Sequence, residues 1–420
     1  MRLTDTAVHA AFRAEARGFI AARGPHHLER ELRRMLFEGH AFSGEPEELA
    51  ESRAWQKTKF DHGYGMISWP EAVGGYGLGV AEEAIFMEEE GLLGVLNDHF
   101  IIGRGMCAPT LMAFASHEQK AVLLPAIASA ENIWCQLFSE PGAGTDLAGV
   151  RTRAEQTGGG WRINGQKVWT SGAHYAQFGL LLVRTNPDAP RHKGLTMFFV
   201  RMDSPGLEVR PIPQMTGRAH FNEVFLENVI VPDAQRLGPV NGGWGVAMVT
   251  LGNERLAIGG TLRLGVGEML RMALEPGPDG HAPIEDPALR RRIADWHARQ
   301  SGIRYGNQRL LEATAKGGNP GAEGAAAKLL GGTMMQEIGE AALDLMGPLA
   351  AVQSAEPDRR LLQDLFLAAP LRRIAGGSDE VIRNIIAERV LRLPPEPNPF
   401  PQTPFRDVPT SAASAALGRV

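Results

Sequence analysis

The stretch "LFSEPGAGTDLAGV", residues 137–150, marks the point where the character of the chain changes. Before it, apolar residues recur at spacings of three and four, which is typical of amphipathic helices. After it come short runs rich in Val, Ile, Phe, Leu and Trp, separated by turn residues, which indicate strands. Gly142 and Gly144 let backbone N–H groups approach a ligand closely, and Thr145 adds a hydroxyl. On composition alone, a surface loop is an equally good interpretation.

The pattern on both sides of this stretch predicts an α+β chain in four parts. Residues 1–132 are expected to form an N-terminal helical domain. Residues 133–237 predict a middle antiparallel β domain of about seven strands. Helical periodicity returns over 238–396, the predicted C-terminal helical bundle, and residues 397–420 are a proline-rich tail expected to extend over the surface.

Three local features carry further predictions. The Asn-Gly pair in "WRINGQKVW", residues 161–169, predicts a tight hairpin. The periodicity over 243–273 predicts one uninterrupted helix. Cys107 and Cys135 are too few and too far apart for a metal knuckle or a disulfide scaffold, so we expect two buried free thiols.

The overall composition excludes several classes of partner. The 420 residues carry a net charge of −5 with a pI of about 6.2, so no general basic surface favours nucleic acid. No apolar run reaches ~18 residues without a charge, so no membrane-spanning helix is expected. The first helix has acidic residues early, unlike a secretory signal or a transit peptide, and we therefore expect a cytoplasmic protein.

A second stretch, "GQKVWTSGAHYA" at 165–176, combines an aromatic residue with hydroxyls at the end of a predicted strand. The indole of Trp169 beside the hydroxyls of Thr170 and Ser171 suits a flat heteroaromatic ring, with a hydroxyl that bonds a ring nitrogen. Taken alone, an aromatic residue at a strand end is more often part of the core.

Together, the two stretches resemble the acyl-CoA dehydrogenase family in order and spacing. The resemblance continues in "GMISWPEAVGGYGLG", in "FNEVFLENVIVP" followed by "GGWGVAM", and in "GGSDEVIRNIIAERVLRLP" at 376–394. It covers nearly all of the chain from about residue 55 to residue 394. The segments "SEPGAGTD" and "RNIIAERVL" are specific enough that chance is remote.

The resemblance implies a cofactor, a reaction and partners. It implies bound FAD and α,β-dehydrogenation of an acyl-CoA thioester in fatty acid β-oxidation. An electron-transferring flavoprotein then accepts the electrons, and the chain forms a homodimer or homotetramer. The family positions expected to contact the cofactor are Leu137, Phe138, Ser139, Thr145, Trp169, Ser171, Ser378 and Glu380. Those expected to contact the substrate are Ser139, Thr145 and Arg255.

The reaction needs a carboxylate base for the α-proton, with a pKa raised by burial. In many relatives this Glu lies in the C-terminal signature, where the present chain has Gly376. A smaller group, resembling the isovaleryl and long-chain enzymes, carries it in an "ER" pair, which matches Glu254 and Arg255. On a helix, the residues one turn from Glu254 are not cations, and Arg255 points about 100° away. We therefore predict Glu254 as the base, the alternative being a Glu satisfied by a distant Arg or by water.

Gly376 keeps a separate implied role. Its backbone N–H matches the family donor that polarises the thioester carbonyl. The acids Asp379 and Glu380 follow Ser378, an arrangement typical of a helix N-cap with acids in the first turn. Glycines along "GNERLAIGGTLRLGVG" favour a bulky or branched acyl group, or equally close packing of helices.

The chain also departs from the family. An Arg and a Phe in an "RxxFG" run usually contact the FAD of a neighbouring subunit, but "EPGPDGHAPIEDP" at 275–287 has neither, and Asp344 replaces a common Gln. Two alternatives therefore stand beside the dehydrogenase. One is a non-catalytic or half-site subunit of a hetero-oligomer, and the other is a flavin monooxygenase on the same fold.

Overall fold

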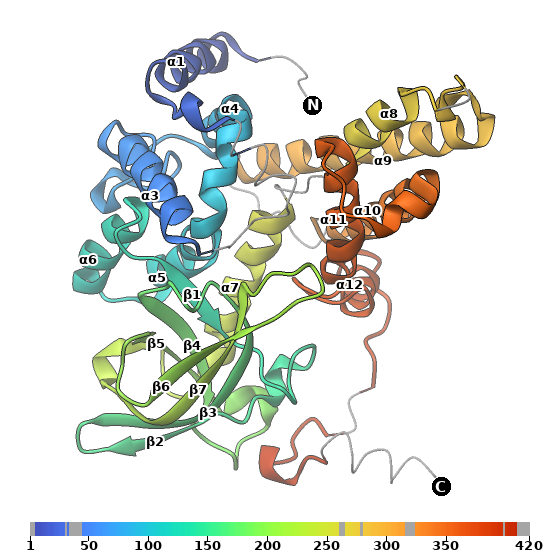
Figure 1. Ribbon diagram of the computed structural model, residues 1–420. Coiled ribbons are helices and arrows are strands. Elements are labelled where there is room, and N and C mark those ends of the chain that lie inside the picture. Colours follow the sequence, from blue (N-terminus) through green and yellow to red (C-terminus); the bar gives the residue numbers. More distant parts are fainter. Residues whose placement is uncertain are drawn as a thin grey trace, which may run out of the picture.

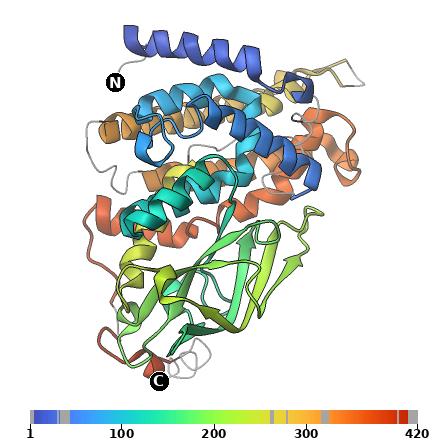
Figure 2. The same ribbon diagram turned by 90° about the vertical axis from the view of Figure 1, so that its left-hand side faces the viewer.

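The computed structural model describes residues 5–29, 32, 44–259, 265–277, 280–315, 324–397 and 400–409. Figures 1 and 2 show a β-sheet on one side and the N-terminal and C-terminal helices stacked on the other. This is the predicted order of a helical, a β and a second helical part. None of the described helices is long and apolar enough to cross a membrane.

The N-terminal helices pack around an aromatic core. Phe12, Trp55, Tyr64 and Phe86 are buried together there. The helices are α1 (Ala7–Arg23), α3 (Pro46–Asp61), α4 (Val80–Glu90), α5 (Ala108–Phe114) and α6 (His117–Ala128), with short 3₁₀ or π segments at η3 (Gly91–Phe100) and η4 (Gly103–Cys107).

The middle part is one eight-stranded sheet in the order β6-β7-β3-β2-β4-β5-β8, with β1 beside β4. The β1–β4 and β2–β4 pairs are parallel, so the sheet is mixed rather than wholly antiparallel as predicted. The strands are β1 (Trp134–Leu137), β2 (Arg153–Thr157), β3 (Gly160–Ser171), β4 (Phe178–Arg184), β5 (Leu195–Arg201), β6 (Leu207–Ile212), β7 (Phe221–Val231) and β8 (Arg236–Leu237).

The hairpin predicted at Asn-Gly is wrong. Asn164 and Gly165 lie inside β3, and the turn between β2 and β3 falls at the glycines of "QTGGGW". The register of β3 against β7 shifts between Ile163 and Gly165, which marks a bulge. A Cβ at Gly165 would overlap Thr152, so the glycine permits a close approach between neighbouring backbones.

The central strand β4 fixes the position of α7 (Gly243–Gly259), because both of its faces are buried. Leu180 and Leu182 join the hydrophobic cluster that holds Val246 of α7. Leu181 and Val183 join a second cluster, formed mainly by the strands. The first turns of α7 are therefore packed directly on the sheet.

The single helix predicted over 243–273 is wrong. Gly265 has φ +73°, a left-handed conformation that ends helical geometry, and α8 (Val266–Leu274) begins after it. A Cβ at Gly265 would lie too close to Leu365. Glycine is therefore favoured both by the backbone conformation and by the close contact. The bundle continues with α9 (Pro287–Ala315), α10 (Gly324–Met346), α11 (Pro357–Arg372), α12 (Asp379–Ile385) and a π segment, Ile386–Val390.

Both cysteines are buried free thiols, as predicted. Burial raises the pKa of Cys135 to about 12, and it also raises the pKa of Cys107 well above its usual value. Neither thiol is therefore a reactive thiolate at neutral pH. Within the described part of the chain, no group of His, Cys, Asp and Glu is arranged to hold a metal ion.

Candidate functional site

Trp169 has a backbone conformation that is rare for its residue type. Its φ is +60°, in the left-handed region, and the register of β3 against β7 shifts between Lys167 and Thr170. A bulky side chain at positive φ is strained, and such strain gathers at functional sites. The bulge turns the indole outward, where it is 58% exposed and packs edge-on against Phe221. The result is a flat apolar face presented to a ligand.

The stretch around Ser139 lies against this bulge. The N–H of Val168 donates to the carbonyl of Ser139 at 2.9 Å, which ties the two predicted motifs together. Leu137 and Phe138 are buried, while Ser139 is half-buried beside the bulge. Thr145 lies further along the loop and is exposed.

The loop after Ser139 is open around its glycines. The backbones of Glu140 and Ala143 exchange two hydrogen bonds, of 3.1 and 3.0 Å, which form a tight turn. A Cβ placed on Gly142 or Gly144 would meet no atom within 4 Å. Their backbone is therefore accessible to a ligand, as the sequence predicts.

A buried ion pair that the sequence analysis missed fastens this loop to β3. The Lys167 ammonium donates to Glu140 at 2.8 Å and to the carbonyls of Phe138 and Leu182 at 3.0 and 2.7 Å. Glu140 also accepts from the N–H groups of Arg151 at 2.6 Å and Thr152 at 2.9 Å. The signal in the sequence that could have indicated this pair is a lysine within an otherwise alternating strand, together with a Glu in the preceding loop.

The electrostatics of the pair follow from its burial. Burial by itself would raise the pKa of Glu140, but the Lys167 charge and the amide donors more than offset it, so this pKa lies below its usual value. Burial lowers the pKa of Lys167, and the attraction of Glu140 acts against that shift. We interpret the pair as structural, because both charged groups are bonded to each other and to the backbone of the fold.

Ser171 closes β3 and is half-buried opposite Phe221. The preceding hydroxyl, Thr170 Oγ1, is buried and finds no hydrogen-bond partner among the residues that the structure describes. The end of β3 thus offers an exposed indole, a half-exposed hydroxyl and the adjoining backbone of Ser139. This combination fits the planar, polar-edged ring of a flavin.

Glu254 lies on α7, whose two halves differ in packing. Val246, Ala247 and Thr250 are fully buried, and Thr250 Oγ1 shares a hydrogen bond of 2.8 Å with Thr110 of α5. By contrast, the four successive residues Leu251–Glu254, which cover most of the helix circumference, are all half-exposed. Glu254 is one turn beyond Thr250 on the same face, so its carboxylate is partly desolvated and still accessible.

The C-terminal signature forms the predicted N-cap. Gly376 and Gly377 have φ of +70° and +100°, and the Ser378 hydroxyl accepts from the Val381 N–H at the start of α12. Glu380 is fully exposed, and backbone and Ser378 hydrogen bonds lower its pKa. This confirms the capping role that the sequence predicts for Ser378 and its acids.

Asp379, the other acid in this turn, is buried. It accepts from Arg373 Nε at 2.7 Å and lies 3.8 Å from the Lys328 ammonium. Lys328 donates to the carbonyl of Gly377. The local sequence pattern predicts only a capping acid at Asp379, and it does not reveal these ion pairs.

The linker over 275–287 places no arginine or phenylalanine at this end of the bundle. In its described residues, Glu275 accepts from Arg359 at 2.9 Å, and Pro283–Glu285 form a 3₁₀ turn. Asp344 is exposed at the end of α10. The side chain of Arg255 falls outside the described atoms, so its predicted contact with substrate stays a prediction.

Comparison with known proteins gives the same order of parts. Family models for the N-terminal, middle and C-terminal domains of acyl-CoA dehydrogenases match residues 6–131, 135–229 and 241–391. The chain belongs to the acyl-CoA dehydrogenase family. It is therefore an oxidoreductase that acts on CH–CH bonds, and a flavoprotein with FAD as its cofactor.

Several named relatives resemble this acyl-CoA dehydrogenase closely. It is 38% identical to acyl-CoA dehydrogenase IpdE1 of Mycobacterium tuberculosis over 399 residues, covering 92% of this chain and 98% of the relative. It is 40% identical over 328 residues to acyl-CoA dehydrogenase FadE34 of the same organism, but that match spans 78% of this chain and only 44% of the longer FadE34.

Solved structures share the whole architecture of this acyl-CoA dehydrogenase. The Tcur3481-Tcur3483 steroid ACAD superposes with a TM-score of 0.78 at 28% identity, covering 94% of this chain and 100% of the other. The ChsE4-ChsE5 complex from Mycobacterium tuberculosis gives a TM-score of 0.76 at 29% identity, with the same coverage. Both names denote assemblies of two different chains.

Proposed function

We propose that this enzyme dehydrogenates an acyl-CoA thioester between its α- and β-carbons, with Glu254 as the base. The proposal rests on the position of Glu254, where α7 leaves the packed core and its carboxylate becomes reachable. Glu254 would take the α-proton as the α C–H bond breaks, and the double bond forms as a hydride leaves the β-carbon. Bound FAD supplies the hydride acceptor, which an electron-transferring flavoprotein would reoxidise.

The residues around the bulge would hold the flavin. The Trp169 indole would cover one side of the ring, Ser171 would donate to a ring nitrogen, and the backbone of Leu137–Ser139 would line its edge. Thr145 would lie near the pyrophosphate and the substrate. Ser378 and Glu380 would contribute from the first turn of α12.

Gly376 would polarise the thioester carbonyl through its N–H. An oxyanion donor must be fixed before the reaction begins. The left-handed φ of Gly376 and Gly377 and the capped start of α12 restrict this backbone. With glycine at this position there is no second carboxylate there to compete with Glu254.

We further propose a bulky, steroid-derived acyl group as the substrate. The name of the Tcur3481-Tcur3483 enzyme states that it is a steroid enzyme. In this chain, the half-exposed turn Leu251–Glu254 includes Gly252, where an added Cβ would meet no atom within 4 Å. The absence of a side chain at this turn of α7 leaves room along the helix that carries the base, which favours a wide acyl group over a narrow straight chain.

The test is Glu254→Gln, which keeps the shape of the side chain and removes the base. We expect flavin reduction by the best substrate in a panel of steroid and straight-chain acyl-CoAs to slow by about 10²–10⁴-fold. Stopped-flow bleaching of the flavin band measures it. Glu340→Gln, on the exposed face of α10, is the matched control. Its flavin should be reduced by the substrate at the wild-type rate. A near-native rate for Glu254→Gln would exclude it as the base.

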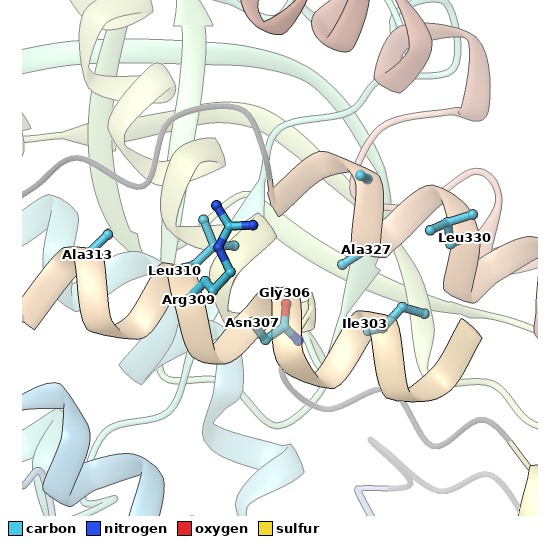
Figure 3. Close-up of a pocket in the computed structure, with 10 residues that line it drawn as sticks. Ile303, Gly306, Asn307, Arg309, Leu310, Ala313, Ala327 and Leu330 are labelled. Atoms are coloured by element: carbon cyan, nitrogen blue, oxygen red, sulfur yellow. The ribbon is translucent and has the colours of Figure 1, made fainter. Parts of the chain in front are cut away.

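A second candidate function is that of one subunit in a hetero-oligomer. A groove of about 300 Å³ lies between α9 and α10 (Figure 3). It is lined mainly by small and apolar residues, among them Leu330, which is 45% exposed, and also by the polar Asn307 and Arg309. Such an exposed apolar surface between helices suits a partner helix. Together with the linker over 275–287, it supports a partner that completes the FAD site.

The composition of the purified protein separates the two candidates. Expressed alone, a half-site subunit should purify without stoichiometric flavin, and it should gain flavin when its partner is added. One FAD per chain in a homodimer or homotetramer, measured by absorbance and mass photometry, would eliminate the hetero-oligomer.

A further inference from the structure

Residues 400–409, called the strap here, lie on the β domain, away from the C-terminal helices (Figures 1 and 2). Pro404 forms an isolated β-bridge with Pro190. The N–H of Phe405 donates to the carbonyl of Ala189 at 3.0 Å. The proline-rich composition predicts an extended tail, but it does not predict that residues 400–409 dock at a defined place.

Phe405 is the apolar anchor of the strap. Its ring is 5% exposed, and the guanidinium carbons of Arg184 and Arg151 lie 3.7 and 5.0 Å from its centroid. A guanidinium stacks well on an aromatic face, and the attraction grows when water is excluded. Phe405 therefore covers a cationic side chain at the end of β4.

Arg184 in turn holds the end of the stretch 137–150. Its guanidinium donates to the carbonyl of Ala148 at 2.6 Å and to that of Val150 at 3.4 Å. It also donates to the carbonyl of Arg191 at 2.6 Å. A buried arginine that bonds only neutral carbonyls depends strongly on its surroundings to stay in place.

We propose that the strap is a positioning device for the cofactor loop, and that Phe405 is its positioning residue. Phe405 keeps water from Arg184, so that Arg184 holds the carbonyls of Ala148 and Val150 and thereby fixes the Gly-rich turn before them. The inference rests on the proposed contact of this loop with FAD. It adds a function for a segment that lies beyond the residues matched by the family models.

The test is Phe405→Ala in the purified holoenzyme. Without the ring, Arg184 becomes hydrated and its bonds to the loop compete with water. We expect FAD to leave about tenfold faster on dilution, measured by the rise in flavin fluorescence. Hydrogen exchange should accelerate at the amides of 147–152 and stay unchanged in the N-terminal helices.

Three further variants keep the proposal falsifiable. Phe405→Tyr retains the ring and should release FAD near the native rate, whereas removal of residues 398–420 should match Phe405→Ala. Arg406→Ala removes exposed ion pairs with Asp188 and Asp407 and should change release less than about twofold. Native FAD release after the removal, or exchange that accelerates throughout the molecule, would overturn the proposal. Glu254→Gln should leave FAD release unchanged, which separates this test from that of the base.

Discussion

Glu140 and Asp379 are both buried carboxylates beside the candidate site, one in the β domain and one in the C-terminal helices. Glu140 accepts from an ammonium and from two backbone N–H groups. Asp379 has one close partner, Arg373, while Lys328 lies 3.8 Å away and donates to the carbonyl of Gly377. Asp379 Oδ1 is buried and has no hydrogen bond among the described residues.

The difference shows which side of the site is complete without a ligand. On the β side, the charge of Glu140 is matched by the Lys167 ammonium and by two backbone N–H groups, so the loop and the Trp169 bulge are held before a cofactor arrives. On the helical side, the acid is only partly matched, next to two glycines with left-handed backbone. We infer that the β side is preformed and the helical side is adjusted by what binds there.

The largest effect is expected from Lys167→Met, which leaves Glu140 buried without its cation. Breaking one partner of a buried pair costs about 3–5 kcal/mol. Urea unfolding should show this loss, and the purified variant should retain less flavin. Lys57→Met removes the exposed pair with Asp61 and is the matched control, at about 0–1 kcal/mol. Equal losses of unfolding free energy in Lys167→Met and Lys57→Met would contradict the assigned difference between the buried and the exposed ion pair.

A smaller effect is expected from Asp379→Asn, because its side chain accepts fewer hydrogen bonds than that of Glu140 and its partner Arg373 is partly exposed. The substitution keeps the shape and leaves Lys328 without its acid, which should cost about 1–3 kcal/mol in urea unfolding. Asp61→Asn is the exposed control. A loss as large as that of Lys167→Met would show that the helical side is as rigidly built as the β side.

The smallest effect is expected in the pH dependence of the stability difference between the wild type and Lys167→Met. The pKa of Glu140 is lower in the fold than in the unfolded chain, so its contribution is full above the unfolded value and is lost as the pH falls through the folded one. In Lys167→Met, burial raises that pKa, so protonation relieves the buried charge. The difference in unfolding free energy between wild type and variant should therefore narrow from pH 7 to pH 4.5. A constant difference would show that Glu140 does not titrate as assigned.

The sequence predicts those parts of the fold that depend on local pattern. Helical and strand periodicity predicted the order of a helical, a β and a second helical part. The motifs around Ser139 and Trp169 also lie together, because a backbone hydrogen bond connects them. The N-cap at Ser378 was also predictable, because the residues that form it are adjacent.

What the sequence did not predict depends on contacts between distant residues. Lys167 and Glu140 are 27 positions apart, and the sequence of neither segment indicates that the two side chains will form a pair. An Asn-Gly pair marks a bulge as well as a turn, so Gly165 was misread until its neighbour Thr152 was visible. The role of Gly265 depends on Leu365, a hundred residues away.

The docking of Phe405 on Arg184 has a consequence for the order in which the molecule is made. The cofactor loop, residues 137–150, emerges from the ribosome long before the strap, because the rest of the β domain and the whole helical bundle, more than two hundred residues, lie between them. At roughly 5–20 residues per second, that interval lasts tens of seconds. During this time the β domain can fold while the loop is not yet held by Phe405, and the loop is fixed only after the strap has been synthesised.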